Sequence, residues 1–194
     1  MQKIKTAILI SGRGSNMQAL IEAAKNPNYP AQIALIISNK DTAAGLDFAS
    51  QNGIKTAVIN HKNFASRQDF DQEMAKLIDE NDCQIVCLAG FMRILSEWFV
   101  DKFQGRMINI HPSLLPAFKG EKAVVDALNY PVKISGCTTH FVTKEMDSGP
   151  IILQAAVEIL KNDTAETLAA RILKQEHIIY PQSLMIVCNN ITTK

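Results

Sequence analysis

Residues 3–16, KIKTAILISGRGSN, decide the fold that this sequence predicts. The first half of this stretch becomes almost wholly apolar toward its end, which is typical of a β-strand buried on both faces of a parallel sheet. The strand stops at the polar, glycine-containing residues 11–16, and Met17, Leu20 and Ile21 then recur at a helical spacing. A strand, a glycine turn and a helix are the beginning of a βαβ unit.

The glycine turn is also the first candidate binding site. It directs backbone N–H groups and the positive end of a helix at the space above the strand, which suits a phosphate group. Met17 stands where a dinucleotide-binding turn has its third glycine, and the turn lacks the lysine of a Walker motif. The turn can be read as no more than a tight connection, but its hydroxyl and amide donors favour a monophosphate.

The alternation of strands and helices continues along the chain. We expect further strands over residues 32–38, 56–59, 84–90, 107–110, 134–142 and 151–159, and helices over 42–51, 67–81, 121–129 and from about 164 onward. This pattern predicts a single α/β domain over residues 1–194, with an open, mainly parallel twisted sheet flanked by helices. Ligands of such sheets bind beyond the carboxyl ends of the strands.

Bulk composition narrows the classes of partner. The 194 residues are 47% apolar and 20% charged, as in an ordinary soluble enzyme, and a net charge of +1 gives no reason to expect nucleic acid or an anionic membrane as a partner. The four cysteines form no C-x-x-C pair, and no Cys/His cluster has metal-ligand spacing. The sequence has no long apolar stretch, so we expect a soluble, cytoplasmic protein without a metal.

A second stretch, residues 107–116 (MINIHPSLLP), indicates where the chemistry lies. If the strand persists to its end, Asn109 and His111 project from the same face of the sheet, and Pro112 then ends the strand. Asn109 capping a turn beside a packed histidine is the simpler interpretation; the strand-end position and the stiff Pro-x-x-x-Pro exit favour an active site. We expect the Leu115–Pro116 bond to be cis, although few X–Pro bonds are.

Three further features point to ligands or partners. Arg67 opens a predicted helix, where a cation meets the unfavourable end of the helix dipole; it is either solvated or near an anion. The apolar residues 91–95 follow a buried strand and must be covered by residues 98–100 or line a pocket for a flat ligand. Glu176 falls on the apolar stripe of the last helix and needs a partner, either a basic residue or a ligand amine or hydroxyl.

With these motifs assembled, the sequence resembles the glycinamide ribonucleotide (GAR) formyltransferases of purine synthesis. The resemblance covers nearly the whole chain and rests on residues 11–16, 89–95, 109–116, 140–142, 146–151 and 175–177. It implies a formyltransferase-type, Rossmann-like fold and transfer of the formyl group of 10-formyltetrahydrofolate to the amine of GAR. Where the family often has a proline and a histidine-bearing loop after Phe118, this sequence has Lys119 and then Glu121, so we assign that loop no role.

The resemblance also implies roles for individual residues. Asn109, His111 and Asp147 would be catalytic. Gly14, Ser15 and Asn16 would hold the substrate phosphate, and Glu176 would lie near the glycinamide end. The folate would lie against Met92, Arg93, Ile94, Leu95, Asn109, Thr143 and Asp147, with Arg67 nearby.

The chemistry of these residue types fits a formyl transfer. A primary amine attacks a formyl carbon through a tetrahedral oxyanion, to which Asn109 and a protonated His111 would donate hydrogen bonds. Asp147 would keep His111 charged and oriented. The reaction requires neither a metal nor a nicotinamide cofactor.

Other classes of protein remain as alternatives. A formyltetrahydrofolate hydrolase would use water in place of the amine; such proteins carry an N-terminal regulatory domain and a second histidine where this sequence has Pro112. Transfer-RNA formyltransferases carry a C-terminal domain. A non-catalytic nucleotide-binding module would explain the glycine turn but not Asn109, His111 and Asp147. We expect small-molecule partners only, and a monomer or a homodimer.

Overall fold

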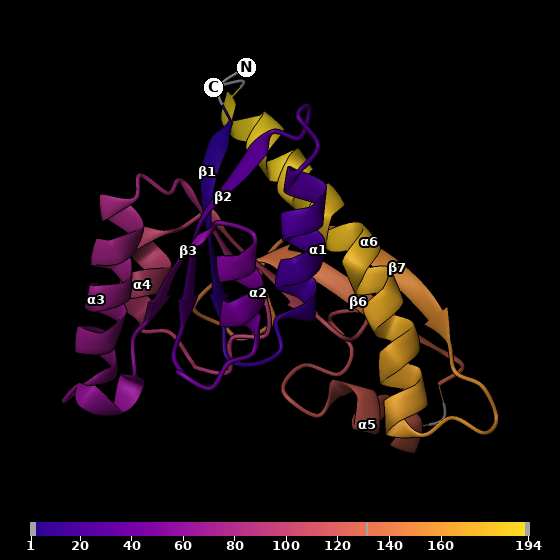
Figure 1. The fold of residues 1–194 in the computed structure, drawn as a ribbon. Coiled ribbons are helices and arrows are strands. Elements are labelled where there is room, and N and C mark those ends of the chain that lie inside the picture. Colours follow the sequence, from indigo (N-terminus) through magenta and orange to yellow (C-terminus); the bar gives the residue numbers. More distant parts are fainter. Residues whose placement is uncertain (1–2, 131, 193–194) are drawn as a thin grey trace.

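The computed structural model describes residues 3–130 and 132–192 (Figure 1). Its elements in chain order are β1 (Ile4–Ile10), α1 (Ser15–Ala24), β2 (Ala31–Ser38), α2 (Gly45–Gln51), β3 (Lys55–Val58), the 3-10 helix η1 (His61–Asn63), α3 (Arg67–Glu80), β4 (Ile85–Leu88), α4 (Glu97–Lys102), β5 (Met107–His111), α5 (Ala123–Asn129), β6 (Ile134–Phe141), β7 (Ile151–Glu158) and α6 (Ala165–Thr192). The expected order of strands and helices is confirmed.

The strands form one seven-stranded sheet in the order β3-β2-β1-β4-β5-β6-β7. The pairs from β3 to β5 are all parallel, whereas β6 is antiparallel to both β5 and β7. The predicted open, mainly parallel sheet is therefore confirmed. Strand β4 is shorter than expected because the chain turns at Gly90, where φ is +75°.

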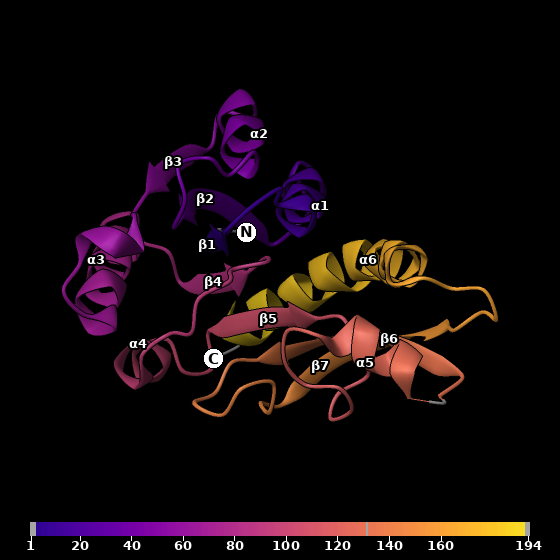
Figure 2. The ribbon, with the colours of Figure 1, turned by 90° about the horizontal axis from the view of Figure 1, so that it is seen from below.

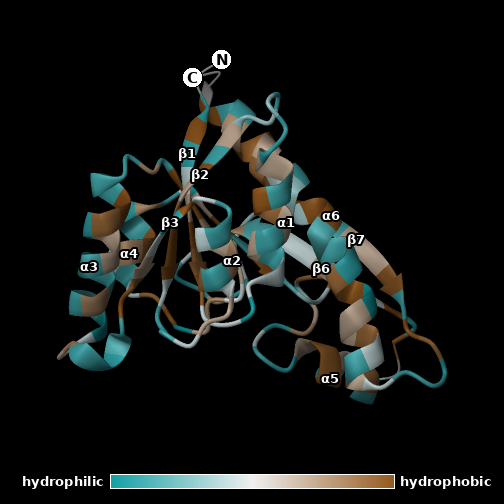
Figure 3. Ribbon diagram, in the orientation of Figure 1, coloured by the Kyte–Doolittle hydropathy of each residue, from teal (hydrophilic) through white to brown (hydrophobic). Residues whose placement is uncertain are grey.

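Helices cover the sheet on both faces. Helices α1, α2 and α6 lie on one face, and α3 and α4 lie on the other (Figure 2). Successive residues of a strand point to opposite faces of the sheet and so pack in two separate hydrophobic cores. Ile8 and Ile108 pack on the α1/α6 side, whereas Leu9 and Met107 pack on the α3/α4 side. The strands are accordingly apolar and the outer helix surfaces polar (Figure 3). Among the described residues, no helix has the length and apolarity needed to cross a membrane.

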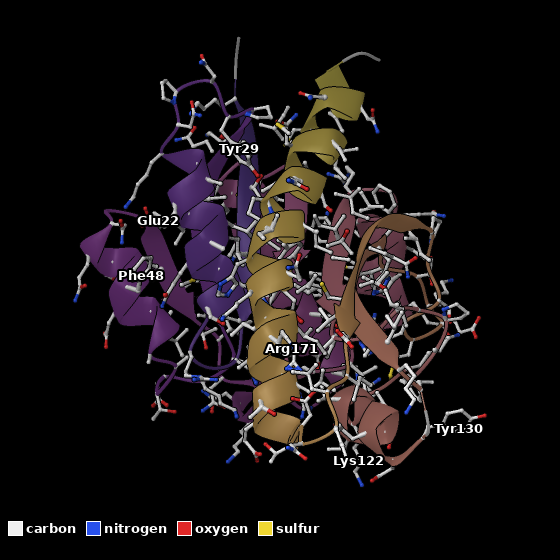
Figure 4. The ribbon with its side chains drawn as sticks, turned by 90° about the vertical axis from the view of Figure 1, so that its right-hand side faces the viewer. Glu22, Tyr29, Phe48, Lys122, Tyr130 and Arg171 are labelled. Atoms are coloured by element: carbon white, nitrogen blue, oxygen red, sulfur yellow. The ribbon has the colours of Figure 1, made fainter. Side chains whose placement is uncertain are left out.

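Two tyrosine hydroxyls attach the long helix α6 to the rest of the fold. Tyr180 is fully buried, and its hydroxyl lies 2.9 Å from the carbonyl oxygen of Leu88 and 3.2 Å from that of Ile108, between β4 and β5. The Tyr29 hydroxyl donates to the carbonyl oxygen of Pro181, inside α6, at 2.7 Å (Tyr29 is labelled in Figure 4). These bonds fix the helix that carries Glu176 against the centre of the sheet.

We expect Tyr180→Phe to lower the free energy of unfolding by about 1–2 kcal/mol, because it removes a buried donor and leaves its carbonyl partners without it. For a chain of this size, thermal denaturation would show this as a fall in Tm of roughly 2–8 °C. The exposed Tyr130 supplies the matched control, and Tyr130→Phe should leave Tm almost unchanged. An equal Tm for the two variants would contradict the anchoring role of Tyr180.

Candidate active site

Strands β5 and β6 bring the first polar side chains together. Their antiparallel register sets Asn109 opposite His140 and His111 opposite Thr138, so all four side chains lie on the face that also carries Met107. Asn109 Nδ2 lies 3.3 Å from His140 Nε2. The prediction that Asn109 and His111 share a face is confirmed.

Asp147 reaches this face from the loop between β6 and β7. Its Oδ2 lies 3.4 Å from His111 Nδ1, and its Oδ1 lies 3.7 Å from His140 Nε2. The Gly120 backbone N–H donates to Oδ2 at 2.8 Å. Asp147 has a φ of +50°, an uncommon value for a residue other than glycine, which the surrounding contacts hold in place. The three residues expected to be catalytic therefore form one cluster.

His140 is a member of the cluster to which the sequence assigned no role. Its Nδ1 lies 2.9 Å from the Phe141 carbonyl oxygen, which can only accept, so Nδ1 carries the hydrogen. Burial lowers the pKa of His140, against the raising effects of that hydrogen bond and of the Asp147 charge. The neutral ring then presents a lone pair on Nε2, which accepts from the Asn109 amide. His140 thereby fixes the orientation of Asn109.

His111 is held between two acceptors. Its Nε2 lies 2.8 Å from the Phe118 carbonyl oxygen, and its Nδ1 faces Asp147. A doubly protonated ring satisfies both contacts, since each nitrogen then donates. The segment that follows Phe118 also lies against the Asp147 loop, because Lys119 Nζ donates to Ser148 Oγ at 2.5 Å. The Phe118 carbonyl oxygen therefore occupies the Nε2 donor of His111, and the segment after Phe118, to which the sequence assigned no role, contacts the Asp147 loop.

The turn after β5 is fixed by side chains from the next two strands. Thr138 Oγ1 donates to the Ser113 carbonyl oxygen at 2.7 Å and accepts from the Leu115 N–H at 3.0 Å. Gln154 Nε2 donates to the Leu115 carbonyl oxygen at 2.9 Å. The Leu115–Pro116 bond is cis, as predicted.

The glycine turn after β1 has the geometry expected of an anion site. Gly14 has a φ of +68° and precedes α1, and no side chain caps the helix there. A Cβ at this position would lie 3.1 Å from Met17 Cε, so glycine suits both the conformation and the space. The first N–H groups of α1, from Ser15 onward, have no acceptor within the helix and remain available to an anion.

Asn16 connects this turn to Glu176. Asn16 Nδ2 donates to Glu176 Oε2 at 2.7 Å, across 160 positions of the chain. Within the described structure the partner of Glu176 is therefore an amide and not the basic residue that was one of the two expectations. Burial raises the pKa of Glu176, whereas the hydrogen bond from Asn16 opposes the shift. Asn16 Oδ1 is buried and has no hydrogen-bond partner.

The apolar loop after β4 is only partly covered. Phe91 and Leu95 pack against the α3/α4 core, together with Phe99 of α4. Met92 and Ile94, in contrast, are 64% and 60% exposed. Packing thus explains half of the loop and leaves two large apolar side chains at the surface, as expected of a ligand-binding edge.

Two further residues predicted to contact the folate, Arg67 and Thr143, lie at the surface. Arg67 is the exposed first residue of α3, and its charge and that of Arg93 both act on the buried carboxylate of Asp71. Thr143 is exposed as well, and its hydroxyl donates to the Glu145 carbonyl oxygen at 3.1 Å within the Asp147 loop. No group of three or more metal-binding side chains is found in the described part of the chain.

The fold and the site together define an α/β protein with a cluster of amide, imidazole and carboxylate side chains at the end of its central strands. The chain belongs to the formyl transferase family, which matches residues 4–184. The family resemblance inferred from the motifs is thereby confirmed.

Individual relatives support this assignment. The chain is 51% identical to the "Trifunctional purine biosynthetic protein adenosine-3" of Homo sapiens over 188 residues, which are 97% of this chain and 19% of that protein. It therefore spans about a fifth of such trifunctional relatives. It is 45% identical to the "Phosphoribosylglycinamide formyltransferase" of Escherichia coli (strain K12) over 174 residues, 90% of this chain and 82% of that protein.

Solved structures agree with the fold. The crystal structure of phosphoribosylglycinamide formyltransferase from Brucella melitensis superposes with a TM-score of 0.92 at 47% identity, covering 96% of each chain. The glycinamide ribonucleotide transformylase 1 from Symbiobacterium toebii superposes with a TM-score of 0.95 at 41% identity, covering 97% of this chain and 89% of the other.

The neutral state of His140 can be tested directly. We expect NMR titration to give a folded-state pKa below the ordinary value of about 6.5, with the hydrogen on Nδ1. Because the unfolded chain then binds more protons as pH falls below about 6.5, His140 should contribute a loss of stability toward acid pH. The same ring in the urea-unfolded chain is the control. A folded-state pKa above that of the unfolded chain would contradict this assignment and the orientation of Asn109 that depends on it.

Proposed function

We propose that this protein transfers the formyl group of 10-formyltetrahydrofolate to the amine of GAR, giving formyl-GAR and tetrahydrofolate. The observation that carries this proposal is the cluster of Asn109, His111, His140 and Asp147, which combines amide and imidazole donors with a carboxylate. The formyl transferase family and relatives with this activity in their names support the same reaction. The activity belongs to purine (IMP) biosynthesis and one-carbon metabolism.

The residues of the cluster take different parts in the reaction. The GAR nitrogen attacks the formyl carbon and forms a C–N bond, and the oxygen of the tetrahedral intermediate becomes an oxyanion. Asn109, oriented by His140, donates to that oxygen, and His111 donates from Nε2. Asp147 holds His111 protonated and accepts the proton that the attacking amine loses, through water. Collapse of the intermediate breaks the bond to the folate nitrogen, which takes up a proton.

The two substrates bind on either side of the cluster. We assign the GAR phosphate to the turn of Gly14, Ser15 and Asn16, and the glycinamide end to Glu176, which Asn16 holds in place. We assign the folate ring system to Met92, Arg93, Ile94 and Leu95 on one side and to Asn109, Thr143 and Asp147 on the other, with Arg67 nearby. Exposed apolar side chains at Met92 and Ile94 support this assignment.

The proposal extends to the setting of the reaction. The 194 residues act as one domain, because a single sheet carries both substrate regions. The partners are the two small molecules, without nucleic acid or membrane, and the protein is a cytoplasmic monomer or homodimer. Formyl-folate is a co-substrate, and the reaction needs no metal or nicotinamide.

We expect release of folate, followed by absorbance, to depend on GAR. The physical reason is that the GAR amine is the attacking nucleophile, and water should replace it only poorly. Purified protein is mixed with 10-formyltetrahydrofolate with and without GAR. Equal rates in both mixtures would instead indicate a formyltetrahydrofolate hydrolase, and binding of GAR without turnover would indicate a non-catalytic module.

We expect Asp147→Asn to lower kcat at least about a hundredfold, because the amide cannot hold His111 in its charged form or accept a proton. Binding of both substrates should change little, since the lost interaction strengthens only as charge develops. The measurements are kcat, both dissociation constants and Tm. The exposed Asp79, which pairs with Lys102 at the far end of α3, gives the matched control Asp79→Asn.

Asp147 also has a structural alternative, in which it only stabilises its turn through the Gly120 N–H. Near-normal kcat with a lowered Tm in Asp147→Asn would establish that alternative and refute the catalytic role.

A further inference from the structure

The loop after β4 is fastened at both ends by buried side chains. At one end the Met92 N–H donates to Ser11 Oγ at 2.8 Å, and at the other the Ser96 N–H donates to Asp71 Oδ2 at 2.6 Å. Between these two bonds lie the exposed side chains of Met92 and Ile94. Both bonds act on the backbone, so they set the position of the loop whatever its side chains are.

The Ser11 end of the loop is part of a buried hydrogen-bond chain. Ser11 Oγ donates its one hydrogen to Asn39 Oδ1 at 2.6 Å, which leaves its lone pairs for the Met92 N–H. Asn39 is itself 1% exposed, and its Nδ2 lies 3.3 Å from His61 Nδ1. The chain of bonds therefore links the carboxyl ends of β2, β1 and β4.

The Asp71 end of the loop is costly to maintain. Asp71 is 0% exposed, its Oδ1 is buried with no hydrogen-bond partner, and burial raises its pKa. The charges of Arg67 and Arg93 act on it, yet neither forms an ion pair with it within 4 Å in the described structure. A buried carboxylate with one satisfied oxygen destabilises a fold. Stability alone therefore does not explain Asp71, and the hydrogen bonds that it accepts come from Ser96, at the end of the loop.

We propose that Ser11 and Asp71 are positioning residues that hold residues 92–95 as a preformed edge for the folate ring system. The inference rests on the proposed function and goes beyond it, because neither side chain is among those assigned to a substrate. An apolar edge that is ordered before binding loses less conformational entropy when a flat ligand binds to it. Releasing either end should therefore weaken folate binding. Asp71 lies outside the turn of residues 11–16, so its release should leave GAR binding almost unchanged, whereas Ser11 is the first residue of that turn and its release acts on both substrates.

The test compares three variants with one control. Ser11→Ala and Asp71→Ala each remove an acceptor, whereas Asp71→Asn keeps an oxygen that can accept from the Ser96 N–H. Thr6→Val, in the strand that precedes Ser11, removes a buried hydroxyl that donates to the Ile4 carbonyl oxygen of the same strand, and is the control. The readouts are kcat, the KM for 10-formyltetrahydrofolate, the KM for GAR, and NMR amide exchange at Met92 and Ser96.

We expect the two alanine variants to raise the KM for formyl-folate about tenfold, with faster exchange at the amide that each releases. Asp71→Ala, which lies outside the GAR turn, should raise the KM for GAR less than about twofold. Asp71→Asn should stay within about threefold of the wild-type folate KM, and Thr6→Val should match the wild type in both KM values.

Three outcomes would overturn the inference. The first is a lowered Tm with both KM values unchanged, which would show that the hydrogen bonds of Ser11 and Asp71 to the loop serve stability alone. The second is an equal rise of both KM values in Asp71→Ala. If Asp71→Ala does not fold, an unchanged folate KM in Ser11→Ala is the third. The wild-type assay separates this inference from the proposed function. GAR-dependent turnover with any of these outcomes refutes only the positioning role of Ser11 and Asp71. A wild type that neither turns over nor binds formyl-folate refutes both proposals.

Discussion

The candidate site depends on one structural constraint, the antiparallel pairing of β5 with β6. In this register Asn109 lies opposite His140, and the two side chains meet at 3.3 Å. A shift of one residue would turn His140 to the other face of the sheet, toward α6. Asn109 would then lose the acceptor that orients its amide, and Asp147, carried by the loop after β6, would no longer be held beside His111.

Local sequence patterns predicted the sheet well because each strand has its own signal. The apolar run before the glycine turn, and the alternation that places Asn109 and His111 on one face, are visible within a few residues. The identity of the partner across the sheet is different information. His140 stands 31 positions from Asn109, and only the register of two strands, the second of which runs against the parallel order, places it there.

The buried acids Glu176 and Asp71 also show that local sequence patterns do not identify a contact between distant segments of the chain. The apolar stripe of α6 indicated that Glu176 needs a partner, and that expectation was correct. The partner itself, Asn16, comes from the other end of the chain and could not be chosen by local reasoning. Asp71 carried the same kind of signal, because it stands three residues before Met74 and seven before Ile78 on the apolar stripe of α3, but it was not singled out from the sequence. Its burial follows from the packing of α3 against the loop before α4.

The contact between the Phe118 carbonyl oxygen and His111 Nε2 bears on how the proposed reaction gains its rate. The carbonyl is a neutral acceptor, as the formyl oxygen of the bound substrate is, so exchanging one for the other gains little in the ground state. An oxyanion accepts a stronger, charge-assisted hydrogen bond. In the proposed reaction this exchange would become favourable as the tetrahedral intermediate forms, so that His111 would stabilise the transition state more than the substrate. Asn109, already oriented by His140, would be available to the formyl oxygen from the start.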